Sequence, residues 1–368
     1  MTITAVTLVV LGVVLLVVGA ECLVRGASRF ASMLGVSPLI IGLTIVAFGT
    51  SAPELAVSIR AAFGGQADLA LGNVVGSNIC NVLLILGASS LVAPLVVAQQ
   101  LVRLDVPIMI GVSGLMLLFG LDGMISSSDG VILFVGGVVY TLFLLVQSRR
   151  EKDQGVQDEY AQEYGPRPYS WRQAVINICL SIVGVIVLVF GSQLLVKGAV
   201  DIATAMGASA LVIGLTIVAI GTSLPELATS MVASFRGERD IAVGNVVGSN
   251  IFNILVVLGA TSAISPDGIQ ISSAALSFDI PVMVAVSVMC FPIFFSGNLV
   301  SRGEGALLLS YYVAYTLYLF LDVTNHGSSQ TLGSVLKFVI VPLTAIALSL
   351  MTWQSQRARQ SRPSRREP

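Results

Sequence analysis

Two short stretches place a glutamate next to a proline inside long apolar runs. Residues 50–54 read TSAPE and residues 222–226 read TSLPE, so Glu54 and Glu226 occupy matching places. A carboxylate at the centre of a membrane helix costs about 2.5–3.5 kcal/mol on insertion scales, and two cost about twice as much. A chain tolerates that cost where cations or protons neutralise the charge, so these glutamates are the first candidates for a functional site.

The neighbours of both glutamates add oxygen ligands. Pro53 and Pro225 have no N–H, so the carbonyl groups four residues earlier lose their helical hydrogen-bond donors. Hydroxyl groups stand beside these carbonyls, and hard cations such as Ca²⁺ bind carboxylate, carbonyl and hydroxyl oxygens. The hydroxyl residues are Thr50, Ser51, Thr222 and Ser223.

A second pair of segments supplies amide and further hydroxyl groups. Residues 72–81 read GNVVGSNICN and residues 244–253 read GNVVGSNIFN. Side chains spaced by four lie on one face of a helix, and small residues such as Gly72 and Gly76 are expected to let helices approach closely in lipid. The polar residues on this face are Asn73, Ser77 and Asn81 in the first segment and Asn245, Ser249 and Asn253 in the second.

Both pairs of motifs are separated by the same offset of 172 residues. Residues 39–58 match residues 211–230 at 16 of 20 positions, and residues 68–87 match residues 240–259 at 14 of 20. A fixed offset over long segments indicates an internal repeat. The chain is therefore predicted to consist of two homologous halves.

The composition indicates what surrounds these motifs. Of the 368 residues, 55% are hydrophobic and 11% are charged, and the mean hydropathy is +0.92. Soluble domains carry about 25% charged residues, and apolar runs of about 18 residues or more predict membrane-spanning helices. The fold class expected is an all-α polytopic membrane protein. The net charge of −1 gives no support for binding nucleic acid.

Hydropathy predicts eleven spans, five in each half and one extra at the C-terminal end. The predicted spans are 4–22, 38–63, 69–92, 104–121, 130–148, 173–196, 209–235, 241–264, 279–296, 304–322 and 337–354. The predicted units are a first repeat at 1–148, a hydrophilic linker at 149–171, a second repeat at 172–324, and the extra span with a basic tail at 325–368.

An odd number of spans per half predicts that equivalent spans cross the membrane in opposite directions, an inverted-topology repeat. With the N-terminus outside, 16 of the 19 basic residues fall on the cytoplasmic side, and the exceptions are Arg60, Lys197 and Lys337. Basic residues gather on the cytoplasmic side of membrane proteins. We expect a multi-pass protein of the cell membrane with its C-terminus in the cytoplasm.

Other kinds of site have weaker support. Cys22, Cys80, Cys179 and Cys290 are scattered without CxxC spacing, which favours a role as small buried side chains. His326 is the single histidine, which disfavours a histidine metal site. Neither an HExxH motif nor a phosphate-binding loop is present, so an intramembrane enzyme is disfavoured and no cofactor is expected.

The paired motifs resemble a known family. The blocks GLTIVAFGTSAPE with GNVVGSNICN and GLTIVAIGTSLPE with GNVVGSNIFN look like the two signature repeats of the calcium/cation antiporter superfamily, and most of all its prokaryotic sodium/calcium exchanger branch. The resemblance covers spans 1–10. It implies a central core of spans 2, 3, 7 and 8 that holds clustered cation sites, with spans 1 and 6 sliding across it.

The resemblance also implies the ligands of the transported Ca²⁺ and Na⁺. The implied side-chain ligands are Glu54, Asn81, Glu226 and Asn253, with Thr50, Ser51, Ser77, Thr222, Ser223 and Ser249 as hydroxyl or carbonyl contributors, and the backbone carbonyls of Ala47 and Ala219 at the outer sites. Some family members carry aspartate at one of the two asparagine positions, whereas this chain has asparagine at both.

The sequence leaves several functional alternatives open. The expected activity is exchange of Ca²⁺ for Na⁺ by alternating access, but a buried glutamate can also exchange H⁺, and another divalent cation can replace Ca²⁺. A passive cation channel would use the same carboxylates, although two inverted halves favour alternation. The coupling stoichiometry, the direction in the cell and the oligomeric state stay open.

Overall fold

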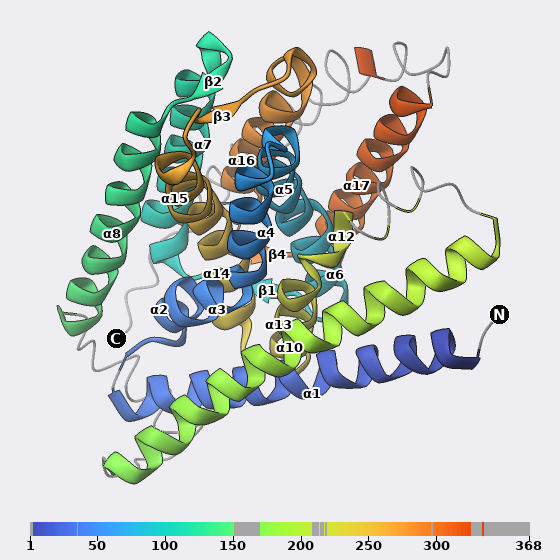
Figure 1. Cartoon of the computed structure of the whole chain (residues 1–368). Coiled ribbons are helices and arrows are strands. Elements are labelled where there is room, and N and C mark those ends of the chain that lie inside the picture. Colours follow the sequence, from blue (N-terminus) through green and yellow to red (C-terminus); the bar gives the residue numbers. More distant parts are fainter. Residues whose placement is uncertain are drawn as a thin grey trace.

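A computed structural model describes residues 3–34, 36–150, 170–207, 213, 217, 219–295, 297–324 and 333–334. The described chain is built almost entirely of helices, which confirms the all-α class (Figure 1). The first half contains α1 (Ile3–Leu34), α2 (Pro38–Ile41), η1 (Gly42–Val46), α3 (Ala47–Thr50), α4 (Ala52–Phe63), α5 (Ala67–Cys80), η2 (Asn81–Leu86), α6 (Gly87–Val92), β1 (Leu95–Val96), η3 (Leu101–Asp105), α7 (Val106–Phe119), η4 (Gly120–Asp122), β2 (Met124–Ile125) and α8 (Ser127–Arg150).

The second half contains the matching elements as far as they are described. They are α10 (Trp171–Ala205), α12 (Ala219–Gly221), α13 (Leu224–Phe235), α14 (Arg239–Phe252), η6 (Asn253–Leu258), α15 (Gly259–Ile264), β3 (Ile269–Gln270), η7 (Ala275–Asp279), α16 (Ile280–Phe295), β4 (Leu299–Val300) and α17 (Arg302–Val323). The segments η1, η2, η3, η6 and η7 are π-helical.

The described helices account for most of the predicted spans. Eight helical segments among the described residues are long and apolar enough to cross a membrane, and a bent pair, Pro38–Thr50 with Ala52–Phe63, adds a ninth. The predicted span 209–235 is described continuously only from Ala219, and the predicted span 337–354 lies outside the described residues. The chain is thus a multi-pass membrane protein.

The first and sixth spans are longer than predicted. The predicted spans end where charged residues begin, near Arg25 and Lys197, but α1 continues to Leu34 and α10 to Ala205. Arginine and lysine are good helix formers, so a charge ends the apolar run without ending the helix. At 32 residues, α1 is about 48 Å long, which exceeds the roughly 30 Å hydrocarbon core. It must therefore tilt or project from the membrane.

The helices α1 and α10 pack side by side through glycines and cross the other helices at a steep angle (Figure 1). A Cβ added at Gly12 would lie 2.6 Å from the backbone nitrogen of Leu195, and one at Gly19 would lie 2.7 Å from that of Leu188. As the residue number of the contact increases along α1, that of its partner on α10 decreases, so the two helices run antiparallel. Small residues permit this backbone contact.

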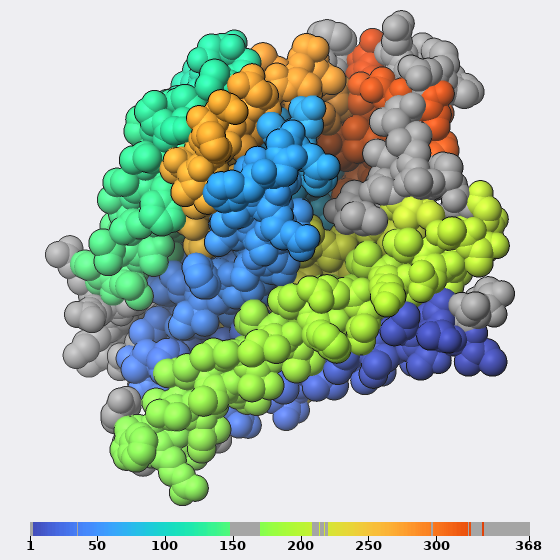
Figure 2. All heavy atoms as spheres, viewed as in Figure 1, coloured from blue at the N-terminus to red at the C-terminus, as the bar shows by residue number. Residues whose placement is uncertain are grey.

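Two segments form the buried centre of the molecule. In Arg239–Ile264, 89% of the most apolar 18-residue window is buried, and in Ala67–Val92 72% is buried, whereas the other candidate spans range from 17% to 39%. Figure 2 shows α4 and the start of α5, in blue, between surfaces of the second half in orange and yellow-green. The expected central place of spans 3 and 8 is confirmed, and the outer helices expose apolar side chains, as lipid requires.

Two short strand pairs join one half to the other. Strand β1 pairs antiparallel with β4, with Leu95 opposite Val300, and β2 pairs antiparallel with β3, with Met124 opposite Gln270. Each strand is two residues long, which is too short for an alternating pattern to show in the sequence. Both pairs hold the ends of helices from different halves together.

A polar contact ties α1 to the connection between α13 and α14. Glu21 on α1 forms ion pairs with Arg25 and with Arg236, and the Ser28 hydroxyl donates to the Glu238 carboxylate at 2.7 Å. The matching positions in the other half, 172 residues away, carry Gln193 in place of Glu21, Gly64 in place of Arg236 and Gln66 in place of Glu238. The other half therefore has no residues that could repeat this ion pair.

The expected close packing at glycines holds in one half. A Cβ at Gly244 or Gly248 would approach backbone atoms of residues 39–43 to 3.0 Å or less. At Gly72 and Gly76, a Cβ would meet no atom within 4 Å among the described residues, and most of the segment that corresponds to residues 39–46, residues 211–218, lies outside them. The packing prediction for Gly72 and Gly76 therefore stays a prediction.

The glycine contact between α1 and α10 predicts a sharp difference between two otherwise similar substitutions. Gly19→Ala should lower the thermal unfolding temperature by several degrees, because its Cβ meets a backbone nitrogen at 2.7 Å and overpacking of this kind costs about 1–3 kcal/mol. Gly111→Ala on α7, where a Cβ meets nothing within 4 Å among the described residues, should be neutral or stabilising. Unfolding of the purified variants in detergent measures both, and equal temperatures would contradict the contact.

Candidate cation site

Each TS-x-PE motif interrupts a helix. Helix α3 ends at Thr50, and Ser51 has φ −82° and ψ 3°, outside the helical region. Helix α4 then begins at Ala52 with Pro53 in its first turn, and the axis bends by 42°. The second half repeats the break between α12 and α13, where Ser223 has φ −86° and ψ 5°. The predicted interruption is confirmed in both halves.

The break places each glutamate at the start of a helix. Glu54 lies in the first turn of α4 and Glu226 in the first turn of α13. A helix N-terminus favours negative charge, because its free N–H groups point toward that end. Both side chains are buried, with exposed fractions of 0% and 1%. The interruption therefore gives two buried carboxylates a favourable position that an unbroken helix would not provide.

A serine from each half contacts the glutamate of the other half. The Ser51 hydroxyl donates to Glu226 Oε1 at 3.3 Å, and the Ser223 hydroxyl donates to Glu54 Oε1 at 3.5 Å. These serines are the residues at which the helices break. The two predicted motifs, which are 172 residues apart in sequence, thus meet at one site.

The two threonines make a second reciprocal set of contacts. The Thr50 hydroxyl donates to Asn245 Oδ1 at 3.1 Å, and the Thr222 hydroxyl donates to Asn73 Oδ1 at 3.2 Å. Each asparagine also lies against the glutamate of its own half. Asn73 donates to the Glu54 carbonyl at 3.0 Å, and Asn245 to that of Glu226 at 3.4 Å.

The two asparagines predicted to be side-chain ligands begin the π-helical segments. Asn81 is the first residue of η2 and Asn253 the first of η6, and neither side chain is exposed. Asn81 Nδ2 donates to Asn250 Oδ1 at 3.0 Å, and Asn253 Nδ2 donates to Asn78 Oδ1 at 3.1 Å. Asn78 and Asn250 are not among the predicted ligands, although both recur at the 172-residue offset within GSN.

Five buried oxygens of the predicted ligands have no hydrogen-bond partner within the described protein. They are Glu54 Oε2, Glu226 Oε2, Asn81 Oδ1, Asn253 Oδ1 and Ser249 Oγ. The large majority of buried side-chain polar atoms in proteins have a hydrogen-bond partner, so five unpaired oxygens within one predicted ligand set call for an explanation. Carboxylate, amide and hydroxyl oxygens are the ligands of Ca²⁺ and similar hard cations. The arrangement can therefore hold a cation between the halves.

The remaining predicted residues have more varied surroundings. The Ser77 hydroxyl oxygen lies 3.1 Å from that of Ser223. The Ala47 carbonyl already accepts from the Ser51 N–H at 3.0 Å and lies 3.3 Å from the Thr50 hydroxyl oxygen. Ala219 begins α12, and its side chain lies outside the described part. Their role as ligands stays a prediction.

Titratable side chains are few at this site. Within the described part of the chain, no three histidine, cysteine, aspartate or glutamate side chains come together in a metal-binding arrangement. All four cysteines are free thiols, and Cys80 and Cys290 are buried as predicted, but the predicted burial is wrong for the exposed Cys179, and Cys22 is only half-buried. The fold and the site together define a polytopic helical membrane protein with a buried, oxygen-lined candidate cation site between two similar halves.

Comparison with known proteins assigns the family. The model of the sodium/calcium exchanger protein family matches residues 4–147 and 176–321, and the starts of these segments differ by the same 172 residues. The chain belongs to the sodium/calcium exchanger family.

Relatives and solved structures agree with this assignment. Inner membrane protein YrbG of Escherichia coli is 38% identical over 317 residues, which cover 86% of this chain and 97% of YrbG. Sodium/calcium exchanger MaX1 of Methanosarcina acetivorans is 31% identical over 346 residues, which cover 85% and 97% of the two chains. The solved structure of the sodium-calcium exchanger NCX_Mj, soaked with Na⁺ and Ca²⁺, superposes with a TM-score of 0.72 at 31% identity, covering 85% of this chain and 97% of that one.

The unpaired oxygens predict that Ca²⁺ stabilises the folded protein. A ligand present at one hundred times its Kd adds about 2.7 kcal/mol to stability when it binds only the native state, so Ca²⁺ should raise the unfolding temperature by several degrees. Glu54→Gln and Glu226→Gln should each remove most of this shift, because each halves the negative charge of the site. Thermal unfolding in detergent over a Ca²⁺ titration measures it.

The matched control is Asp122→Asn, which removes an exposed carboxylate in η4. This variant should keep the full Ca²⁺ shift. An equal loss in all three variants would mean that the shift reflects the overall charge of the protein and not the buried pair.

Proposed function

We propose that the protein is a secondary active antiporter, and not an enzyme, that exchanges Ca²⁺ for Na⁺ across the membrane by alternating access. The observation that carries this proposal is the pairing of Glu54 and Glu226 at one site, each held by a serine of the opposite half. Because both halves contribute to the site, a movement of one half against the other changes its surroundings. Transporters built from inverted repeats place their sites in this way.

Charge balance supports the exchange of a divalent for a monovalent cation. Glu54 and Glu226 supply two formal negative charges, and the amides of Asn81 and Asn253 add none. One Ca²⁺ or two Na⁺ neutralise this charge equally. The site can therefore hold one Ca²⁺ or two Na⁺ without a large net charge, and a net charge buried in an apolar environment is strongly unfavourable.

The names of related proteins support Na⁺ and Ca²⁺ as the transported ions. MaX1 is named a sodium/calcium exchanger, and NCX_Mj is described as a sodium-calcium exchanger soaked with Na⁺ and Ca²⁺. We transfer these ions to this chain as the proposed cargo. The ligands proposed are the residues implied by the sequence motifs, with Glu54, Glu226, Asn81 and Asn253 at their centre.

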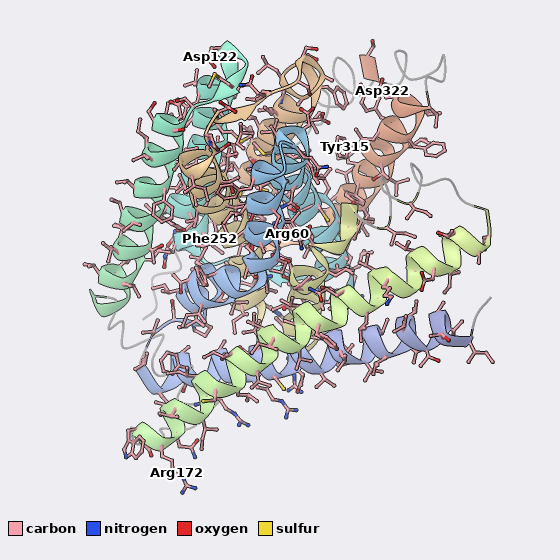
Figure 3. The ribbon with its side chains drawn as sticks, in the orientation of Figure 1. Arg60, Asp122, Arg172, Phe252, Tyr315 and Asp322 are labelled. Carbon is pink, nitrogen blue, oxygen red and sulfur yellow. The ribbon has the colours of Figure 1, made fainter. Side chains whose placement is uncertain are left out.

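The proposed topology is an inverted repeat with the N-terminus outside and the C-terminus in the cytoplasm. The antiparallel packing of α1 and α10 supports opposite directions for the two halves. Figure 3 shows Asp122 and Asp322 toward one end of the molecule and Arg172 at the opposite end, as this topology requires. The name of YrbG, an inner membrane protein, supports placement in the cell membrane. The units 1–148, 149–171, 172–324 and 325–368 stay as proposed.

Coupling to H⁺ is the second candidate, with Ca²⁺ or another divalent cation as cargo. The observation that favours it is that Ser51 and Ser223 contact the carboxylates through hydroxyl groups. A hydroxyl can donate to a carboxylate or accept from a carboxylic acid. The same contacts therefore fit a glutamate that carries a proton during part of the cycle.

Flux into proteoliposomes distinguishes the two couplings. Vesicles loaded with Na⁺ and diluted into K⁺ medium should take up radioactive Ca²⁺, whereas vesicles diluted into Na⁺ medium should not, because the Na⁺ gradient drives the exchange. Glu54→Gln and Glu226→Gln should each reduce uptake to the level of empty vesicles. Asp122→Asn should transport as the wild type does.

A pH gradient imposed without Na⁺ completes the test. Uptake driven by that gradient and indifferent to Na⁺ would replace Na⁺ with H⁺ as the coupling ion. Uptake that needs no counter-ion gradient would indicate a channel and overturn the antiporter.

A further inference from the structure

Four buried asparagines form a crossed arrangement between the two halves. Asn81 of the first half donates through Nδ2 to Asn250 of the second, and Asn253 of the second half donates to Asn78 of the first. All four side chains are at most 2% exposed. Two of the four, Asn81 and Asn253, have an Oδ1 with no hydrogen-bond partner among the described residues. The side-chain Oδ1 atoms of Asn78 and Asn250 both accept hydrogen bonds.

The orientation of Asn78 is fixed by groups that can only accept. Its Nδ2 donates to the backbone carbonyl of Asn250 at 3.2 Å and lies 3.6 Å from the sulfur of Met283. Neither a carbonyl nor a thioether has a hydrogen to give. The amino group of Asn78 must therefore face these two acceptors, and its Oδ1 must face Asn253.

Asn250 is oriented in the corresponding way. Its Nδ2 lies 3.5 Å from the sulfur of Met109, and its Oδ1 accepts from Asn81. Met109 and Met283 are themselves buried, on α7 and α16. The sulfur contacts come from helices outside the central four, so the surrounding helices determine which way the inner amides point.

We propose that Asn78 and Asn250 are positioning residues that turn Asn253 and Asn81 so that each presents its oxygen, and not its amino group, to the cation. An asparagine amide has one acceptor end and one donor end, and only the oxygen can coordinate a cation. By accepting from Nδ2, each positioning residue leaves Oδ1 of its partner for the cation. This inference rests on the proposed function, because it assigns a role to residues beside the proposed cation site.

The crossed pairing separates a positioning role from simple packing. Asn250 acts on Asn81, and Asn78 acts on Asn253, so each effect should depend on one particular partner. Asn250→Leu removes the acceptor and leaves Asn81 free to turn its amino group toward the cation. The Kd for Ca²⁺ and the KM for Ca²⁺ uptake should rise at least tenfold, while the maximal exchange rate should stay within about threefold of the wild type.

Double-mutant cycles measure the dependence on the partner. Once Asn81→Ala has removed the ligand amide, Asn250→Leu should weaken Ca²⁺ binding by less than a further twofold. Combined with Asn253→Ala, which removes the amide that Asn250 does not contact, Asn250→Leu should keep its full effect. Asn78→Leu should show the opposite preference, with its effect lost in Asn253→Ala and kept in Asn81→Ala.

The chain offers a matched control for the loss of a buried amide. Asn177 on α10 also donates to a methionine sulfur, that of Met33, at 3.2 Å, and is 2% exposed. Asn177→Leu should leave the Kd for Ca²⁺ within about twofold of the wild type. Unfolding temperatures measured without Ca²⁺ identify any variant that is misfolded, and for such a residue the smaller change to serine takes the place of leucine in the same cycles.

The outcomes separate this inference from the proposed function. Unchanged Ca²⁺ affinity in Asn250→Leu and Asn78→Leu would overturn the positioning role while leaving the antiporter intact. The same conclusion would follow if each variant changed the Kd for Ca²⁺ equally in the Asn81→Ala and Asn253→Ala proteins. Wild-type protein that binds Ca²⁺ without exchanging it would overturn the antiporter alone. Wild-type protein that binds neither Ca²⁺ nor Na⁺ would overturn both.

Discussion

The burial of two carboxylates in the centre of a membrane protein is the constraint on which the rest of the structure depends. Glu54 and Glu226 are almost completely buried, and each needs hydrogen-bond donors that an unbroken apolar helix cannot supply. The helix breaks at Ser51 and Ser223 provide hydroxyl donors and place the carboxylates at helix N-termini. The most deeply buried helical segments pack around this pair, and the glycine-rich helices α1 and α10 lie against it from outside.

The sequence was sufficient for the features that depend on local pattern. Hydropathy located most of the described spans, and the prolines located the breaks, because both signals lie within a few residues of the structure they cause. The ends of α1 and α10 were wrong because a charge ends a hydrophobic run but does not end a helix. The two-residue strands could not be predicted, because their pairing joins residues more than 140 positions apart.

The candidate site also combines features that local sequence predicts with features that depend on distant residues. The types of its ligands follow from the repeated motifs, but the orientation of their amides does not, because it depends on Asn78, Asn250 and two methionines on other helices. The structure also bears on why asparagine stands at both positions 81 and 253. Each of these residues donates a hydrogen to a carbonyl oxygen, and an ionised aspartate would have no hydrogen to give.

The reciprocal contacts have the form of an isologous dimer interface, in which residue i of one subunit contacts residue j of the other and j contacts i. Ser51 with Glu226 and Ser223 with Glu54 follow this rule within one chain. In a true homodimer every substitution appears twice, so the two sides must remain identical. Joining the two halves in one chain removes that restriction. The Glu21–Arg236 ion pair is an example, because the equivalent positions in the other half carry Gln193 and Gly64 and cannot form it. In the proposed exchange cycle, breaking or keeping this one-sided ion pair would give the two end states different free energies even without an ion gradient.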